Sequence, residues 1–133
     1  MSPEVRIPVA TDRDIVAARQ EGRRLAASLN FSPSDLTVIA SAISEVARNI
    51  VTYGRNGHVA ICLVERAGRR GVAIVAQDEG PGIQDLTLAM QDGYSTSGSL
   101  GLGLPGARRL VDEFEIRSTA DAGTTVTMRK WAR

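Results

Sequence analysis

An almost continuous apolar run from Val72 to Ala76 constrains the fold of this chain more than any other feature. Turn-forming residues precede the run at 67–71 and Asp78 follows it, which predicts a central strand of a sheet. A central strand needs neighbours, and other segments alternate apolar and polar residues or read as strands. These segments are residues 5–9, 58–64, 114–116 and 126–128.

Helical segments lie between the strand segments. Thr11 caps the first, with Asp14 at the capping-box position, and Ser32 followed by Pro33 caps the second. The second helix ends at Gly54, and its apolar stripe consists of Leu36, Ile39, Ile43, Ala47 and Ile50. We also expect a short helix at 86–90 and another beginning near Pro105. Hairpin strands with inserted helices predict an α/β (α+β) two-layer sandwich, with a mixed sheet covered on one face.

Composition limits the classes of protein that this chain can belong to. Its 133 residues, 43% of them hydrophobic, fit one domain over residues 1–133. The net charge of +1 without charge blocks predicts no nucleic-acid or membrane partner. A single cysteine, Cys62, and no signal-peptide pattern predict a cytoplasmic location. Lys130 is the only lysine, which excludes a P-loop and the strand lysine of ordinary protein kinases.

Glu45 and Asn49 are the first candidate functional pair. Four residues apart on a helix, they share one face about 6 Å apart along the axis. A carboxylate there could activate a hydroxyl or water, and the amide oxygen could hold Mg²⁺. Taken alone, however, the pair fits better a solvated helix edge with a local side-chain hydrogen bond.

Asp78, Gly80 and Gly82 follow the apolar run directly. The carboxylate can accept a hydrogen bond from an exocyclic amino group such as that of adenine. The glycines would let the backbone pass close to a flat ring. A strand-to-helix turn with a capping acid explains the same residues equally well.

A segment rich in glycine and hydroxyl groups, residues 95–106, precedes the last helix and could cradle phosphate groups. A flexible surface loop is the alternative. Gly101-x-Gly103-x-x-Gly106 also matches the dinucleotide fingerprint, but it follows a loop rather than a strand, and too little chain remains for a doubly wound sheet. Thr124, at the entry to the final strand, could bind a ligand or the Asp78 side chain.

Taken in chain order, four of these short motifs resemble the N, G1, G2 and G3 boxes of the Bergerat-fold ATPases, which include gyrase, Hsp90, histidine kinases and MutL. The motifs are Glu45-x-x-x-Asn49, Asp78-x-Gly80-x-Gly82, Gly101-x-Gly103 and Gly123-Thr124. Further stretches resemble the RsbT family, the switch kinases of bacterial stressosomes, from end to end. They are residues 14–19, 44–49 and 92–98, and Lys130-Trp131. The resemblance implies a mostly antiparallel sheet.

The resemblance to RsbT-type kinases also implies an ATP- and Mg²⁺-dependent serine/threonine kinase. Its substrate would be a STAS-domain scaffold protein (RsbS-like) in a stressosome. After release it would activate a PP2C-type phosphatase (RsbU-like) by binding the N-terminal region of that protein. The implied nucleotide-binding residues beyond the acids are Asn49, which also holds Mg²⁺, Gly80, Gly82, Ser97, Gly98, Gly101, Leu102, Gly103 and Thr124.

Within this resemblance Glu45 is the expected general base and Asp78 the acid that reads adenine. One departure is the stretch from Tyr94 to Leu100, which lacks the arginine that related anti-sigma-factor kinases carry, so Arg48 is a further candidate for charge stabilisation. Two alternatives stay open. One is an anti-sigma factor kinase of the same fold that binds a sigma factor directly, and the other is a nucleotide-binding interaction module without catalysis.

Overall fold

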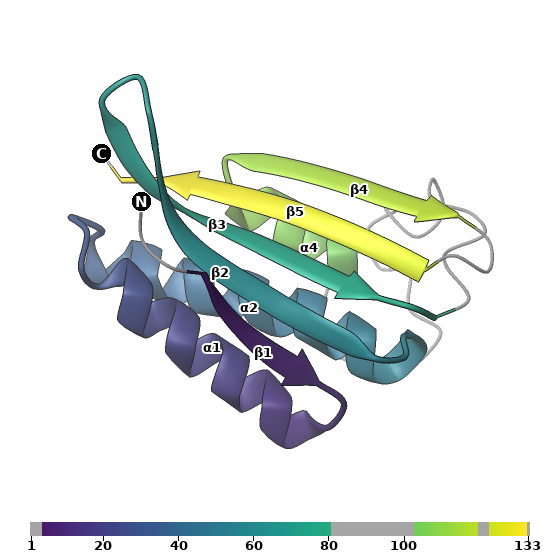
Figure 1. The fold of residues 1–133 in the computed structure, drawn as a ribbon. Coiled ribbons are helices and arrows are strands. Elements are labelled where there is room, and N and C mark those ends of the chain that lie inside the picture. The colour runs from purple at the N-terminus through teal and green to yellow at the C-terminus, as the bar shows by residue number, and fades with distance from the viewer. Residues whose placement is uncertain (1–3, 81–102, 120–122, 133) are drawn as a thin grey trace.

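The computed structural model describes residues 4–80, 103–119 and 123–132, in which five strands form a single sheet (Figure 1). The strand order is β1-β2-β3-β5-β4. The predicted run lies in β3, the middle strand, and is confirmed. The pairings between neighbouring strands are all antiparallel, so the mostly antiparallel sheet implied by the resemblance is confirmed, and none of these described pairs is parallel as a mixed sheet would require. The strand bounds are β1 (Val5–Val9), β2 (Gly57–Arg66), β3 (Arg69–Asp78), β4 (Glu113–Thr119) and β5 (Gly123–Trp131).

Three helices of the described chain cover one face of this sheet and leave the other open (Figure 1). They are α1 (Asp12–Ala26), α2 (Pro33–Tyr53) and α4 (Gly103–Leu110). The two-layer prediction is therefore confirmed. Not one of these helices is long and apolar enough to cross a membrane.

The predicted caps fix where α1 and α2 begin. The Ser32 hydroxyl accepts the backbone N–H of Asp35 at 3.1 Å, with Pro33 at the first helical position. At α1, Asp14 accepts the backbone N–H of Thr11 at 3.0 Å, as in a capping box. The backbone N–H groups of Ala10 and Thr11 lower the pKa of the Asp14 carboxyl.

The core lies between the helices and the covered face of the sheet. Ile39 and Ile43 of the predicted stripe on α2 are fully buried. They pack in one cluster with buried side chains of the central strands, Ile61, Ile74 and Met128. Because this stripe faces the sheet, the polar residues of α2 beside it are held at the edge of the layer interface.

The β2–β3 turn is shorter than the sequence predicts. Only Ala67 and Gly68 connect the strands, with φ of 53° and 79°, and β3 already begins at Arg69. Two successive positive φ angles are the signature of the tight hairpin turn that matches strand twist. Alanine is uncommon in this conformation, so no residue pattern signalled a two-residue loop there.

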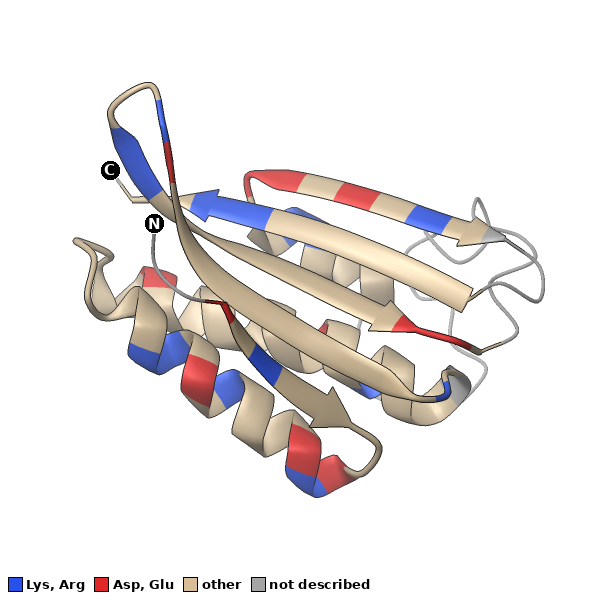
Figure 2. Cartoon of the chain, in the orientation of Figure 1, with Lys and Arg blue, Asp and Glu red and all other residues tan. Residues whose placement is uncertain are grey.

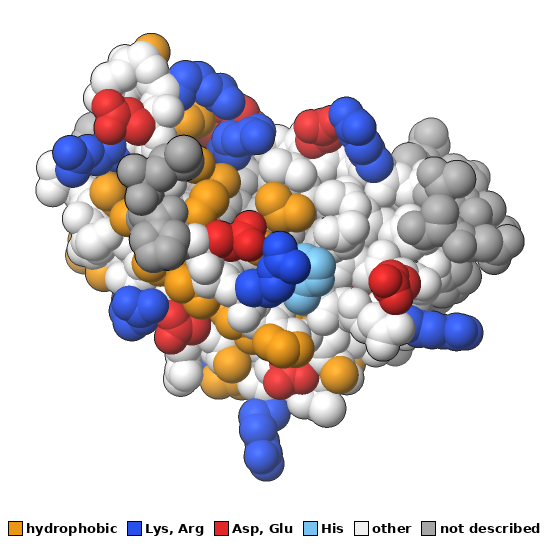
Figure 3. All heavy atoms as spheres, viewed as in Figure 1, with side chains coloured by type: hydrophobic (Ala, Val, Ile, Leu, Met, Phe, Trp, Pro, Cys, Tyr) orange, Lys and Arg blue, Asp and Glu red, His pale blue; other side chains and the backbone are white. Residues whose placement is uncertain are grey.

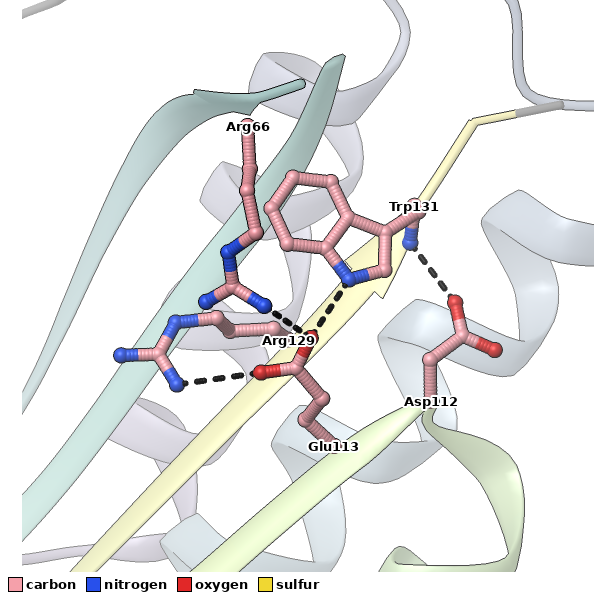
Figure 4. A network of polar contacts seen from close by, with 5 residues as sticks. All are labelled: Arg66, Asp112, Glu113, Arg129 and Trp131. Carbon is pink, nitrogen blue, oxygen red and sulfur yellow. Dashed lines mark hydrogen bonds and ion pairs between the residues drawn. The ribbon is translucent and has the colours of Figure 1, made fainter. Parts of the chain in front are cut away.

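Basic and acidic residues occur along the strands (Figure 2), and in the same view the surface shows charged side chains interspersed with apolar ones (Figure 3). At one end of the sheet, Glu113 joins the ends of three strands (Figure 4). Its Oε2 accepts the Trp131 indole N–H at 2.8 Å and a hydrogen bond from Arg66 at 2.7 Å. Arg129 lies 3.4 Å from its other oxygen, and the Arg66 guanidinium lies 4.9 Å from the indole centroid.

Acid should weaken this network. The hydrogen bond from Trp131, then that from Arg66, lowers the pKa of Glu113 below its usual 4.5. A carboxyl with a lower pKa in the folded state contributes stability that is present above 4.5 and is lost as pH falls through the folded value. We expect Glu113→Gln to flatten the acid side of a plot of unfolding midpoint against pH. An unchanged acid dependence would contradict this role.

Gly71 lies under the same indole ring. A Cβ at this position would meet the Lys130 carbonyl oxygen at 2.5 Å and the Trp131 ring at 2.7 Å. Gly71→Ala is expected to lower the free energy of unfolding by about 1–3 kcal/mol, because a strand-paired carbonyl cannot move aside. Denaturant titration measures this, with Gln77→Ala on the same strand as a control that should stay within about 0.5 kcal/mol.

Candidate functional site

Asp78 lies at the end of the central strand, with only 7% of its surface exposed. Its Oδ1 accepts the backbone N–H of Gly80 at 2.8 Å, and the backbone N–H of Thr124 also donates to the carboxyl. Burial nevertheless outweighs these two donors and raises the pKa of Asp78 above its usual 3.8. A buried carboxyl with only backbone donors retains lone pairs for a ligand that donates hydrogen bonds.

Three closely packed glycines lie near Asp78. A Cβ at Gly54, the residue that ends α2, would meet Asp78 Cγ at 2.7 Å. A Cβ at Gly57 would likewise meet the Ile50 side chain and, at 3.2 Å, the Gln77 carbonyl oxygen. Gly123 has φ of +86°, and a Cβ there would strike the Asp78 carbonyl. The Asp78 side chain therefore fits beside Gly54 because that residue lacks a side chain, and Gly123 allows the backbone of β5 to pass close to the Asp78 carbonyl.

Thr124 lies directly opposite Asp78 in the β3–β5 register and is 5% exposed. Its backbone, rather than its hydroxyl, donates to Asp78. The Thr124 Oγ1 lies 3.0 Å from Ser118 Oγ on β4. The structure thus brings Thr124 to the acid as the sequence suggested, and adds a second hydroxyl beside it.

Glu45 lies on α2 with its side chain 17% exposed, and both of its oxygens have partners. Oε1 lies 2.9 Å from a guanidinium nitrogen of Arg48. Oε2 accepts the backbone N–H of Gly103, the first residue of α4, at 2.9 Å. Glu45 does make the local side-chain hydrogen bond of the helix-edge interpretation, to Arg48, but the carboxylate is mostly buried and also contacts a second helix. A carboxylate has about four lone-pair sites, so these contacts leave room for one more donor.

Asn49 is half-buried, one helical turn after Glu45 and little more than one turn before Gly54. At 1.5 Å per residue, the stretch from Glu45 to Gly54 covers about 14 Å of the helix axis. Asp78 marks one end of this stretch, through its contact with Gly54, and the contact with α4 marks the other. Asp78 thus lies at the C-terminal end of α2, and the contact of Glu45 with α4 lies nine residues earlier on the same helix.

The Asn49 side chain suits a magnesium ion that takes most of its ligands from phosphate groups and water. In the described part of the chain, no three His, Cys, Asp or Glu side chains are grouped to hold a metal. The Asn49 amide oxygen is an oxygen ligand of the kind that magnesium accepts, and phosphate oxygens and water would complete the shell.

Several predicted residues lie outside the described part of the chain, namely Gly82, Ser97, Gly98, Gly101 and Leu102. The predicted helix at 86–90 lies there too. A hollow of about 380 Å³ at Arg69, Gly68 and Ala132 is not part of this site. It opens at the opposite end of β3, about 30 Å from Asp78 along the strand.

Sequence reasoning missed the close packing of Gly54 and Gly57 and the position of Ser118. Both glycines follow the end of a helix, where glycine is common. The sequence pattern therefore did not mark them as closely packed positions. Ser118 reaches the site only through strand pairing with Thr124, which spacing along the chain does not reveal.

Comparison with known proteins gives a consistent result. The family described as "Histidine kinase-like ATPase domain" matches residues 9–130. Serine/threonine-protein kinase RsbT of Bacillus subtilis is 47% identical over 133 residues, which is the full length of both chains. Anti-sigma F factor of Thermoanaerobacter sp. is 31% identical, over 90% of this chain and 82% of that protein.

A solved structure supports the fold alone. The mycobacterial sensor histidine kinase MprB superposes with a TM-score of 0.58 at 16% identity. The match covers 98% of this chain and 99% of that one.

Proposed function

Because this chain belongs to the histidine kinase-like ATPase family, as a serine/threonine protein kinase of the RsbT type, we propose that it phosphorylates a STAS-domain protein. The observation that carries the proposal is the 47% identity to RsbT over the full length of both chains. The contacts of Glu45 and Asp78 support it, since each acid has surroundings that suit a separate task.

Glu45 is proposed as the general base. Its partners, the Arg48 guanidinium and the Gly103 N–H, orient the carboxylate at the α2–α4 contact. From there it would accept the proton of the serine or threonine hydroxyl as the phosphorus–oxygen bond forms. Arg48, 41% exposed, has donors left for a partner or a phosphate.

Asp78 is proposed to bind the adenine amino group, and Asn49 the magnesium ion. ATP supplies the phosphoryl group, and magnesium would neutralise part of its charge when bound. Gly80, which donates to Asp78, would hold the acid in place beside the base. Gly82, Ser97, Gly98, Gly101 and Leu102 are proposed to complete the nucleotide site with Gly103 and Thr124.

The partners are proposed from the family. The substrate would be an RsbS-like STAS protein within a stressosome. After transfer the kinase would leave it and bind the N-terminal region of an RsbU-like PP2C phosphatase in the cytoplasm. The similarity to Anti-sigma F factor supports a second candidate, direct binding of a sigma factor.

One experiment separates these functions. The purified chain is mixed with ATP, magnesium and a STAS-domain protein of the same genome, and mass spectrometry follows phosphoserine and phosphothreonine. Time-dependent phosphorylation that requires magnesium is the expected result. ATP binding without transfer would favour the non-catalytic module, and capture of a sigma factor in a parallel pull-down would favour the anti-sigma function.

A further inference from the structure

The outer side of α2 exposes short hydroxyl side chains rather than long charged ones. Apart from Pro33 at the start of the helix, every exposed residue of α2 up to position 52 carries a hydroxyl group. These residues form the hydroxyl face of α2, namely Ser34, Thr37, Ser41 and Thr52. The neighbouring helix α1 is different, because it exposes mostly long or charged side chains, namely Asp12, Arg13, Gln20, Arg23 and Arg24.

This composition is unfavourable for a helix side that faces only water. Serine and threonine have lower helix propensity than arginine, lysine, glutamine and glutamate. Their hydroxyls also compete for backbone groups, and the Thr37 hydroxyl donates to the Pro33 carbonyl at 3.2 Å. Natural sequences break such local rules chiefly where function requires it. Short side chains lose little conformational freedom when another protein covers them, so the hydroxyl face is suited to be an interface.

The proposed base lies on the same side of α2. Residues spaced three and four apart share one side of a helix. This spacing joins the base to the hydroxyl face, in the order Ser34, Thr37, Ser41, Glu45, Arg48 and Thr52. The acceptor hydroxyl of a protein substrate has to come within about 3 Å of the Glu45 carboxylate. Among the described elements, the core and α4 close two sides of this carboxylate, and the hydroxyl face is the open approach.

The exposed charges on this side of α2 are basic. Arg48 is 41% exposed and spends one donor on Glu45, which leaves other guanidinium donors for a partner. From α1, a guanidinium nitrogen of Arg23 lies 3.4 Å from the Thr37 hydroxyl. The two arginines therefore flank the hydroxyl face, at positions about 16 Å apart along the helix axis. A partner segment with acidic side chains has the complementary charge.

We propose that the hydroxyl face of α2 docks the protein substrate, through a segment that carries acidic side chains near the acceptor serine or threonine. This inference rests on the proposed function, because it takes Glu45 as the base that the acceptor hydroxyl reaches. It adds to that function the surface and the charge by which the kinase recognises its substrate.

The charge is tested by comparing Thr37→Glu with Thr37→Gln. The two side chains have nearly the same shape and both can accept from Arg23, so the negative charge is the main difference. Thr37 lies about 12 Å along the axis from Glu45, so the contacts of the base persist. In steady-state transfer to a purified STAS-domain protein of the same genome, Thr37→Glu should raise the KM for that protein about 2–5-fold relative to Thr37→Gln. The difference should shrink at high salt, because exposed charges are screened.

Docking itself is tested with Ser41→Trp. The indole would stand one turn before Glu45 and obstruct a segment that reaches the base. The KM for the STAS-domain protein should rise about tenfold or more, while kcat and ATP affinity are kept. Gln20→Glu and Gln20→Trp, at an exposed position of α1, are the matched controls and should leave the KM unchanged. Circular dichroism checks folding, and Ser41→Tyr replaces Ser41→Trp should that variant not fold.

The outcomes separate this inference from the kinase proposal. Unchanged KM values in Thr37→Glu and Ser41→Trp would overturn the docking surface and leave the kinase proposal intact. Lost ATP affinity, or a lower kcat at unchanged KM, would also contradict docking, because the face would then serve the nucleotide or the base. Equal KM values for Thr37→Glu and Thr37→Gln would exclude an acidic segment. A wild-type chain that transfers no phosphoryl group to the STAS-domain protein would end both proposals.

Discussion

Asp78→Asn should abolish ATP binding while leaving the nucleotide-free protein at least as stable as the wild type. The amide keeps the size of the side chain and one oxygen, whose two lone pairs can accept the N–H of Gly80, now bound at 2.8 Å, and that of Thr124. It removes the acceptor that the adenine amino group needs and turns a donor toward it. A site that leaves buried polar groups unpaired rejects a ligand by several orders of magnitude.

The expected stability gain depends on pH in a defined direction. Burial raises the pKa of Asp78 above 3.8, so keeping the carboxyl ionised in the folded protein costs stability. This cost is absent below the unfolded pKa of about 3.8, grows as pH rises, and is complete above the folded value. The midpoint of thermal unfolding of the Asn variant, relative to wild type, should therefore rise with pH over this window.

Glu79→Gln is the matched control for Asp78→Asn. Glu79 is the next residue, is exposed, and accepts a hydrogen bond from Asn56 at 3.1 Å. ATP affinity should survive in this variant. Undiminished ATP binding by Asp78→Asn would remove Asp78 from the nucleotide site.

Glu45→Gln, in contrast, should still bind ATP but lose phosphoryl transfer. The amide oxygen can still accept the Gly103 N–H, so the α2–α4 contact at 2.9 Å can persist. The variant cannot take up the proton of the substrate hydroxyl, and general-base catalysis is worth about 10²–10⁴-fold. Single-turnover transfer to the STAS protein measures the loss, and nucleotide titration measures binding.

A similar acid–arginine pair elsewhere on the surface provides the control for Glu45. Glu21 and Arg24 on α1 have the same three-residue spacing as Glu45 and Arg48. Glu21→Gln should change neither ATP affinity nor transfer. Full transfer by Glu45→Gln would exclude Glu45 as the base.

The sequence predicted well those features that depend on local chemistry. The caps at Ser32 and Thr11 and the buried stripe with Ile39 and Ile43 follow from hydrogen bonding and periodicity within one segment. The central position of β3 followed from its apolar composition. These features require no knowledge of which segments meet.

Features that arise from contacts between distant segments were harder to predict. Glu45 resembled a solvated edge residue because its partner, Gly103, lies 58 positions away. The antiparallel arrangement of the whole sheet likewise depends on how strands order themselves around β3. Ser118 entered the site through strand register alone.

The glycines around Asp78 have a consequence for how this chain tolerates change. Gly54, Gly57 and Gly123 leave no volume for even a methyl group, irrespective of any bound molecule. A saturation-mutagenesis library scored only for folding should therefore show intolerant positions concentrated at this end of the sheet. Selection for activity and selection for foldability would overlap at these glycines, so their invariance among homologues would not by itself identify them as ligand contacts.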